Sequence, residues 1–213
     1  SHNGLADVDV VITTRELARM IKEAGIDFPN LPDEDFDSLL GESTGASVIF
    51  GATGGVMEAA LRTAYNMITG KELEQVDLTA VRGVEGIKEA SVQVGDLTVN
   101  VAVANGTANA AKLLAQVRSG EKQYHFIEVM GCPGGCVTGG GQPIVSAQKR
   151  MECDPRAVRA AALYREDANK PLRRSHENPE IKALYADYLG APNSHKAHEL
   201  LHTTYTARAK YSK

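Results

Sequence analysis

Two cysteines four positions apart, Cys132 and Cys136, have the residue type and the spacing for metal chemistry. They follow the apolar run from Tyr124 to Val129, which predicts a buried strand. Thiolates are soft donors that suit iron–sulfur clusters. If the segment enters a helix, positions i and i+4 place both sulfurs on one side, with Cβ atoms about 5–6 Å apart. The pair therefore indicates two ligands of one iron–sulfur cube or, alternatively, two buried free thiols.

The glycines around the two thiols favour the cluster over the free thiols. They are Gly134, Gly135, Gly139, Gly140 and Gly141. Without side chains, this backbone can lie directly against a bulky group. A cube needs four ligands, and this chain has at most three cysteines. The third, Cys153, lies in a polar sequence typical of a helix start, and we interpret it as incidental to the cluster.

A second candidate is the glycine-rich stretch Gly51–Gly55, which follows a predicted strand over 46–50 and precedes a predicted helix over 56–69. That setting is typical of a phosphate-binding loop. The stretch lacks both the Lys-Ser/Thr ending of a P-loop and the GxGxxG spacing of a dinucleotide fold. Two alternatives stay open: a tight turn that needs close backbone approach, and a backbone wall against a cofactor other than a nucleotide.

A third candidate is the segment His198–His202, which matches the zinc-binding pattern HExxH. Two imidazoles at i and i+4 can bind zinc while the glutamate activates water. The pattern fixes only three positions, and no third ligand of the usual type follows it. Leu200 and Leu201 predict a packed C-terminal helix, so we favour the structural interpretation over a zinc hydrolase.

Composition limits the classes of function. The chain has 213 residues, 43% of them hydrophobic, with 23 Lys and Arg against 27 Asp and Glu and a net charge of −4. A chain of this kind buries a core, and without a basic block it binds nucleic acid or anionic membranes poorly. No apolar run approaches the ~18 residues of a membrane span, and no signal pattern opens the sequence. Three cysteines do not make a secreted disulfide scaffold.

Hydrophobic periodicity predicts an α/β fold that ends in helices. The predicted strands are 8–12, 46–50, 90–94, 97–103 and 124–129, and the predicted helices are 13–24, 56–69, 108–117, 155–166, 179–189 and 194–208. Gly95-Asp96 predicts a hairpin turn between two of these strands. Thr13 and Glu16 have the spacing of a capping box at the start of the first helix.

Taken together, these motifs resemble a known family. The segment from Phe126 to Cys136, continued by Gly139–Pro143, is similar to the third signature of the iron-only, or [FeFe], hydrogenases. The stretch Ile49–Arg62 resembles the family segment that walls the active site, and the His198–His202 tail is also similar to family members. The resemblance covers essentially the whole chain and implies one lobe of a two-lobed α/β domain, with a sheet flanked by helices.

The resemblance implies reversible reduction of protons to hydrogen. The family's H-cluster is a 4Fe-4S cube joined through one cysteine sulfur to a di-iron unit with CO, CN and a bridging dithiolate. Cys132 resembles a ligand of the cube, and Cys136 resembles the ligand that also bridges to the di-iron unit. The residues that resemble the lining of the di-iron pocket are Phe50, Gly51, Val56 and Met130. No residue of this chain resembles a catalytic acid or base of the family.

The sequence also departs from the family. Two earlier signatures, Thr-Ser-Cys-Cys-Pro and Met-Pro-Cys, are missing, and in the family they supply the other cube ligands and a proton-relaying cysteine. We therefore expect residues 1–213 to be the C-terminal lobe of the H-cluster domain, inactive and without a complete cluster on its own. Gly131 stands beside Cys132 where alanine is commoner in the family.

The implied partners are the N-terminal lobe of the same domain, maturation proteins, and ferredoxin or an NAD(P)H-linked module as electron donor. The expected compartment is the cytoplasm, with the periplasm as the alternative. An alternative function is that of an iron–sulfur assembly or scaffold protein that shares the fold without hydrogen chemistry.

Overall fold

The computed structural model describes residues 8–34, 42–73, 82 and 86–203. The helices are α1 (Thr14–Glu23), α2 (Gly45–Val48), α3 (Gly55–Thr69), α4 (Thr107–Arg118), α5 (Ala147–Glu152), α6 (Pro155–Asn169), α7 (Pro179–Leu184) and α8 (His195–Leu201). The strands are β1 (Ile87–Val94), β2 (Leu97–Asn105) and β3 (Phe126–Met130). Among these residues, no helix is long and apolar enough to cross a membrane.

The strands form one mixed sheet in the order β1-β2-β3. β1 and β2 make the predicted antiparallel hairpin, and their register runs from Ile87 opposite Ala104 to Val94 opposite Leu97. β2 and β3 are parallel, with Val101 opposite Phe126. Parallel strands need a crossover connection, and α4 provides it. The mixed sheet with covering helices confirms the predicted α/β class.

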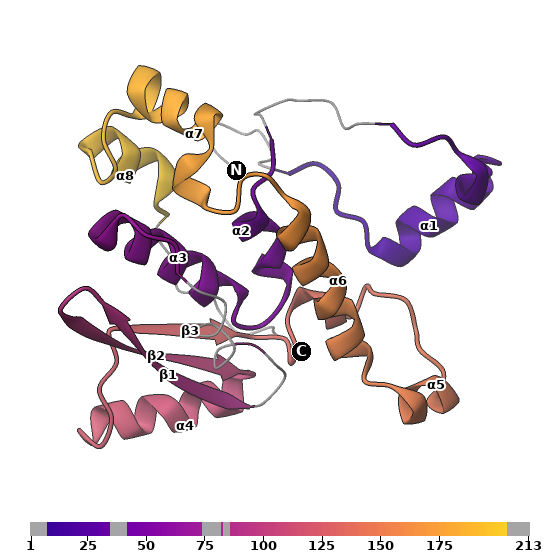
Figure 1. Ribbon diagram of the computed structural model, residues 1–213. Helices are drawn as coiled ribbons and strands as arrows, with labels where there is room; N and C mark the ends of the chain where they lie inside the picture. Colours follow the sequence, from indigo (N-terminus) through magenta and orange to yellow (C-terminus); the bar gives the residue numbers. More distant parts are fainter. Residues whose placement is uncertain (1–7, 35–41, 74–81, 83–85, 204–213) are drawn as a thin grey trace, which may run out of the picture.

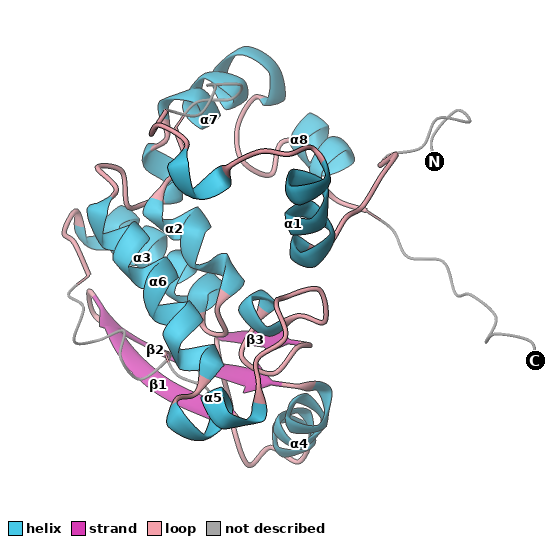
Figure 2. Cartoon of the chain, turned by 90° about the vertical axis from the view of Figure 1, so that its right-hand side faces the viewer, coloured by secondary structure: helices cyan, strands magenta, loops and turns pink. Residues whose placement is uncertain are grey.

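Helices cover both faces of the sheet, α3 on one side and α4 on the other (Figures 1 and 2). Because side chains alternate along a strand, β2 sends Val101 and Val103 to one face and Ala102 and Ala104 to the other. The first cluster consists of Met57, Leu61, Val92, Val94, Val101 and Val103, and the second of Ala102, Ala104, Ala110 and Leu113. The α3 face thus carries the larger core, which fixes α3 and the loop before it against the sheet.

A buried charge network joins α3 to α6. Arg62 donates from Nη1 and Nη2 to the two carboxylate oxygens of Asp167, each at 2.7 Å, and also pairs with Glu58. Arg82 binds Glu58, and Arg173 binds Asp167, both at 2.8 Å. Burial raises the pKa of the Asp167 carboxyl, but the hydrogen bonds from Arg62 and Arg173 lower it more, so the net pKa lies below its usual value.

Most predicted elements are confirmed, and two predicted strands are wrong. Residues 46–50 form α2 and a 3-10 turn, because Thr44 caps a helix through its side chain and Ile49 is buried without a neighbouring strand. Residues 8–12 have no strand partner within the described part of the chain. The predicted helix over 194–208 is observed as α8, and residues 204–208 lie outside the described residues.

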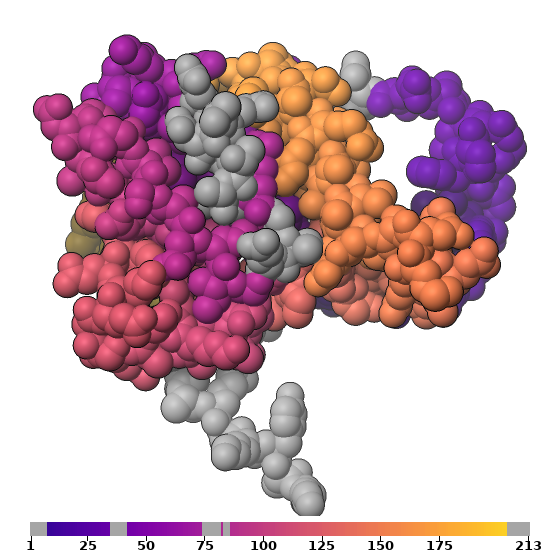
Figure 3. Space-filling model, turned by 60° about the horizontal axis from the view of Figure 1, so that its bottom comes forward, coloured from indigo at the N-terminus to yellow at the C-terminus, as the bar shows by residue number. Residues whose placement is uncertain are grey.

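The segment from residue 8 to residue 31 forms an arm at the edge of the molecule. α1 begins with the predicted capping box of Thr13 and Glu16, yet it has no buried residue. Its apolar side chains and those flanking it are exposed: Val8, Val10, Val11, Ile12, Leu17, Met20, Ile26, Phe28 and Leu31. Over most of its length, this indigo arm stands apart from the body in Figure 3. A helix with this apolar face is typical of one that packs against further polypeptide.

Candidate metal centre

The two cysteines lie on a bent loop that follows β3. Cys132 lies in a bend, and Cys136 opens a 3-10 turn that runs to Thr138. Between them, Gly134 and Gly135 have φ angles of +93° and +99°, which interrupt any helix. The continuous helix on which the i, i+4 geometry depended is therefore not formed. Both thiols are exposed, so the alternative of two buried free thiols is wrong.

Hydrogen bonds fix the backbone of this loop. The Gly134 amide donates to the Asn105 side chain at the end of β2, at 2.9 Å. The Gly135 amide donates to the Cys132 carbonyl at 2.9 Å, and the Thr138 hydroxyl donates to the Gly135 carbonyl at 3.0 Å. The thiols therefore stand on ordered backbone rather than on a free loop.

The two glycine-rich segments pack directly on each other. The Thr53 amide donates to the Gly134 carbonyl at 3.2 Å. A Cβ atom on Gly135 would lie 2.5 Å from the Gly51 carbonyl oxygen and 2.8 Å from the Thr53 nitrogen. Only glycine fits there, because the space is closed and the φ angle is positive. The predicted close backbone approach is thus an approach of one loop to the other.

Glu128 on β3 joins the strand that leads into the cysteine loop to the Gly51–Gly55 stretch and α3, and it was not among the predicted site residues. Its buried carboxylate accepts the Gly54 amide through Oε1 and the Met57 amide through Oε2, both at 2.7 Å. Two amides at the start of α3 are thus bound by a carboxylate of the protein itself, which also lies at the positive end of the helix dipole. A phosphate would need those same amides, so the structure contradicts the nucleotide-loop alternative. The available signal was a single carboxylate in an apolar strand.

The residues that resemble the di-iron lining lie on these two walls. Phe50 and Gly51 belong to the 3-10 turn before α3, where the Phe50 side chain is 45% exposed and Gly51 is half-buried. Val56 stands in the first turn of α3, and Met130 ends β3; both are half-buried. Contact with Gly135 brings Gly51 to the cysteine loop. The walls are therefore adjacent, whereas contact of these side chains with a cluster stays a prediction.

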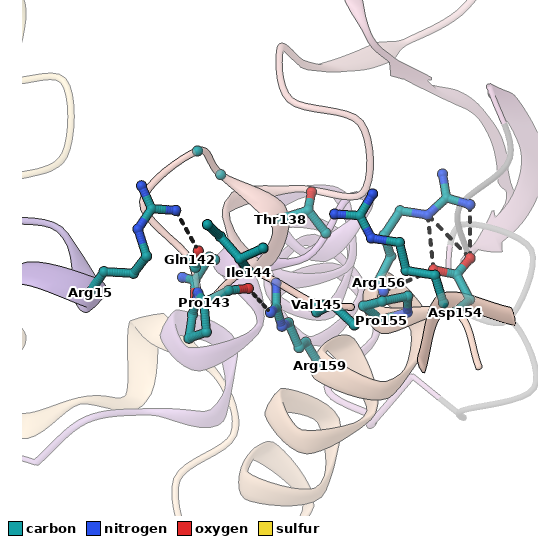
Figure 4. A pocket seen from close by; sticks show the side chains of 13 residues that line it. Arg15, Thr138, Gln142, Pro143, Ile144, Val145, Asp154, Pro155, Arg156 and Arg159 are labelled. Atoms are coloured by element: carbon teal, nitrogen blue, oxygen red, sulfur yellow. Dashed lines mark hydrogen bonds and ion pairs between the residues drawn. The ribbon is translucent and has the colours of Figure 1, made fainter. Parts of the chain in front are cut away.

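The loop after Cys136 borders a cavity of about 390 Å³ lined by four arginines (Figure 4). Arg15 donates to the Gln142 carbonyl at 2.9 Å, and Arg159 donates to the Pro143 carbonyl at 2.9 Å. Arg156 pairs with Asp154 at 2.8 Å, which lowers the pKa of that carboxyl below its usual value. The fourth arginine is Arg150. Positive side chains thus border the glycine-rich loop at this cavity.

The other candidate ligands do not join the two thiols. Cys153 is half-buried and lies within 3.5 Å of the Lys149 carbonyl in its own helix. The rings of His198 and His202 have centroids 4.3 Å apart, but no group of three or more metal-binding side chains occurs in the described part of the chain. A zinc site thus gains no third donor there. The prediction that Leu200 and Leu201 pack is wrong for the described chain, since they are 52% and 58% exposed.

Comparison with known proteins identifies the class. Residues 1–140 match the family described as "Iron only hydrogenase large subunit, C-terminal domain", and residues 153–208 match "Iron hydrogenase small subunit". The chain therefore belongs to the iron-only hydrogenase family. It is 54% identical over 210 residues to the NADP-reducing hydrogenase subunit HndD of Solidesulfovibrio fructosivorans, aligning 99% of this chain with 35% of that protein. It is 51% identical over 203 residues to iron hydrogenase 1 of Clostridium pasteurianum, and that alignment covers 95% of this chain and 35% of that protein.

The fold agrees with that class. The [FeFe]-hydrogenase HydA1 of Chlamydomonas reinhardtii superposes with a TM-score of 0.72 at 45% identity, over 94% of this chain and 56% of that one. The chain spans about a third of the length of HndD and of iron hydrogenase 1. The cytosolic iron-sulfur assembly component 3 of Pongo abelii is more distant, at 30% identity over 209 residues, which are 97% of this chain and 43% of that protein.

Proposed function

We propose that this chain is the C-terminal lobe of an [FeFe]-hydrogenase catalytic domain and that it supplies one side of the H-cluster site. The observation that carries the proposal is the exposed pair Cys132 and Cys136 on a hydrogen-bonded loop that packs on the Gly51–Thr53 wall. The greater similarity to hydrogenases than to the assembly protein favours hydrogen chemistry over the scaffold function.

The residues present fit half of a cube site. Cys132 and Cys136 would hold the 4Fe-4S unit, because cysteine thiolates are the ligands of iron–sulfur clusters; the further link from Cys136 to the di-iron unit is what the family resemblance implies. The described chain contains no third nearby donor, which agrees with ligands on other polypeptide. When bound, the cluster would supply the redox-active iron for proton reduction, with the electrons coming from the external donor. Phe50, Gly51, Val56 and Met130 would line the di-iron pocket and keep water from it.

The remaining ligands would come from an N-terminal lobe of the same domain. Two features of the chain support this partner. The thiols lie at the surface, and the arm over residues 8–31 exposes its apolar side chains, which an adjoining lobe would bury. The two are linked, because the Arg15 amide at the start of α1 donates to the Gly141 carbonyl at 3.3 Å, close behind Cys136.

The electron donor, the maturation proteins and the cytoplasmic location stay predictions. Ferredoxin and an NAD(P)H-linked module are both electron partners of the family, and the relative HndD is named as an NADP-reducing hydrogenase subunit. The similarity to HndD thus supports a nicotinamide-linked electron partner, which in an NADP-reducing enzyme accepts electrons rather than donating them.

The test uses the complete, matured hydrogenase that contains this chain. Cys136→Ala should abolish hydrogen evolution and uptake, and Cys132→Ser should lower the iron content, whereas Cys153→Ser serves as the matched control and should leave both unchanged. The 213-residue chain alone should evolve no hydrogen. Normal turnover of the Cys136→Ala enzyme would contradict the proposal. A correctly matured parent protein without any hydrogen activity would favour the assembly function instead.

A further inference from the structure

Arg159 of α6 donates hydrogen bonds to both ends of the glycine-rich segment 137–143, which directly follows Cys136. Its Nη1 donates to the Val137 carbonyl at 3.0 Å, and its Nη2 donates to the Pro143 carbonyl at 2.9 Å. Val137 directly follows Cys136 and is buried, and Pro143 ends the glycine-rich stretch. One planar guanidinium therefore closes residues 137–143 into a fixed loop, as Figure 4 shows at its Pro143 end.

The same helix also touches both glycine-rich walls. A Cβ atom on Gly51 would lie 2.8 Å from the Leu163 Cδ1 atom, and one on Gly134 would lie 3.0 Å from the Arg156 Cδ atom. α6 belongs to the segment that matches the small-subunit family, whereas the cysteine loop lies in the part that matches the large-subunit family. The contact of Arg159 with Val137 thus joins one family segment to the other.

We propose that Arg159 is a positioning residue through which the small-subunit segment sets the direction of the Cys136 thiol. The loop between its two anchored carbonyls is rich in glycine and would otherwise sample many backbone states. Fixing the carbonyl of Val137 fixes the peptide between Val137 and Thr138, inside the 3-10 turn that Cys136 opens, and so restricts the backbone rotations of that turn. The role of Cys136 as a cluster ligand rests on the proposed function, but the anchoring of the loop does not.

The guanidinium has the geometry that two carbonyl partners require. It presents two N–H donors in a rigid plane, whereas a lysine has a single ammonium on a flexible stem. Arg159→Lys should therefore restore one carbonyl contact and leave the other weak. Arg15 donates to the Gln142 carbonyl in the same loop but not to Val137, so its loss should spare the turn at Cys136.

The first test measures hydrogen–deuterium exchange in the 213-residue chain. The Thr138 amide donates to the Gly135 carbonyl at 3.1 Å and the Gly139 amide to the Cys136 carbonyl at 3.0 Å, so both report the turn. In Arg159→Ala, these two amides should exchange at least tenfold faster, with β3 amides unchanged; in Arg159→Lys, the increase should be smaller. Arg165→Ala, an exposed change on the same helix, is the matched control and should have no effect.

The second test follows the infrared bands of the iron-bound CO and CN in the matured full-length hydrogenase. Arg159→Ala should shift or broaden these bands, Arg159→Lys should do so less, and Arg165→Ala should not. Unchanged exchange at Thr138 and Gly139 would overturn the anchoring. Faster exchange with unchanged infrared bands would overturn the effect on Cys136. If the alanine variant does not fold, Arg159→Lys decides both points. Failure of the proposed function is a separate result: normal turnover of Cys136→Ala.

Discussion

Removing the carboxylate of Glu128 should weaken the fold more than any exposed substitution, because this side chain closes the first turn of α3 from the neighbouring strand. Glu128 is 6% exposed and accepts two backbone amides at 2.7 Å. Hydrogen bonds to a charged group contribute about 1.5–3 kcal/mol each, and a partly buried charge at a helix N-terminus adds up to ~2 kcal/mol.

The alanine variant loses all of these terms and leaves the buried Gly54 and Met57 amides unpaired. We therefore expect Glu128→Ala to lower the free energy of unfolding by about 3–8 kcal/mol, the range that these contributions span together. Glu128→Gln keeps one acceptor oxygen but turns an N–H group toward the other amide, so its loss should be about 1.5–3 kcal/mol. Either loss is a large share of the ~5–15 kcal/mol typical of a domain.

The assay is urea unfolding followed by circular dichroism at 222 nm, with amide exchange at Gly54 and Met57 as a local readout. Glu121→Gln is the matched control, because Glu121 is an exposed carboxylate just before β3 whose side chain binds only the Gln116 amide in the described chain. That change should stay within about 0.5 kcal/mol of the parent. The prediction is wrong if the free energy of unfolding of Glu128→Ala lies within about 0.5 kcal/mol of the parent value, the range typical of surface substitutions, while both amides stay protected from exchange.

Two further predictions concern packing and charge. Gly135→Ala should lower the free energy of unfolding by more than about 3 kcal/mol or prevent folding, because its Cβ would lie 2.5 Å from the Gly51 oxygen at a φ of +99°. The controls are Gly140→Ala and Gly131→Ala, where a Cβ would meet no atom within 4 Å. In the same urea assay they should lower the free energy of unfolding by about 1 kcal/mol or less. Asp167→Asn should cost about 3–5 kcal/mol at pH 7 because it breaks a buried pair. Folding lowers the pKa of Asp167, so its contribution to the free energy of unfolding is complete above the unfolded-state pKa of about 3.9 and is lost as the pH falls through the folded-state pKa. The parent should therefore lose stability in acid more steeply than Asp167→Asn does. Equal slopes for the two proteins would contradict this prediction.

Local signals account for the elements that the sequence predicted correctly. The capping box at Thr13, the Gly95-Asp96 turn and Gly70 at the end of α3 each act within a few residues, so spacing alone reveals them. The strand predicted over 46–50 was wrong because a short buried apolar segment has no periodicity that distinguishes a strand from a helix. Its Thr44 cap, which accepts the Ser47 amide at 3.4 Å, was the sign of a helix.

The site was predictable only in its local part. The cysteine spacing and the glycines marked the loop, since both lie within one stretch of sequence. The groups that hold that loop come from elsewhere in the chain: Glu128 meets amides 71 and 74 residues away, and Arg159 meets a carbonyl 22 residues away. Such pairs depend on the sheet register and on the packing of α6, and single-sequence patterns carry no information on either.

The glycine content of the cysteine loop explains why it needs these distant contacts. Gly135 and Gly141 are required by contact, since a Cβ would lie 2.5 Å from the Gly51 oxygen and 2.7 Å from the Thr13 side chain. Each glycine also gives the unfolded chain extra freedom, which costs roughly 0.5–1 kcal/mol relative to alanine. The Asn105 side chain accepts a hydrogen bond from the loop, and Arg15 and Arg159 donate to it, which offsets that cost without adding a side chain to the loop itself. A bare yet ordered backbone beside two exposed thiols therefore requires anchors that lie outside the loop.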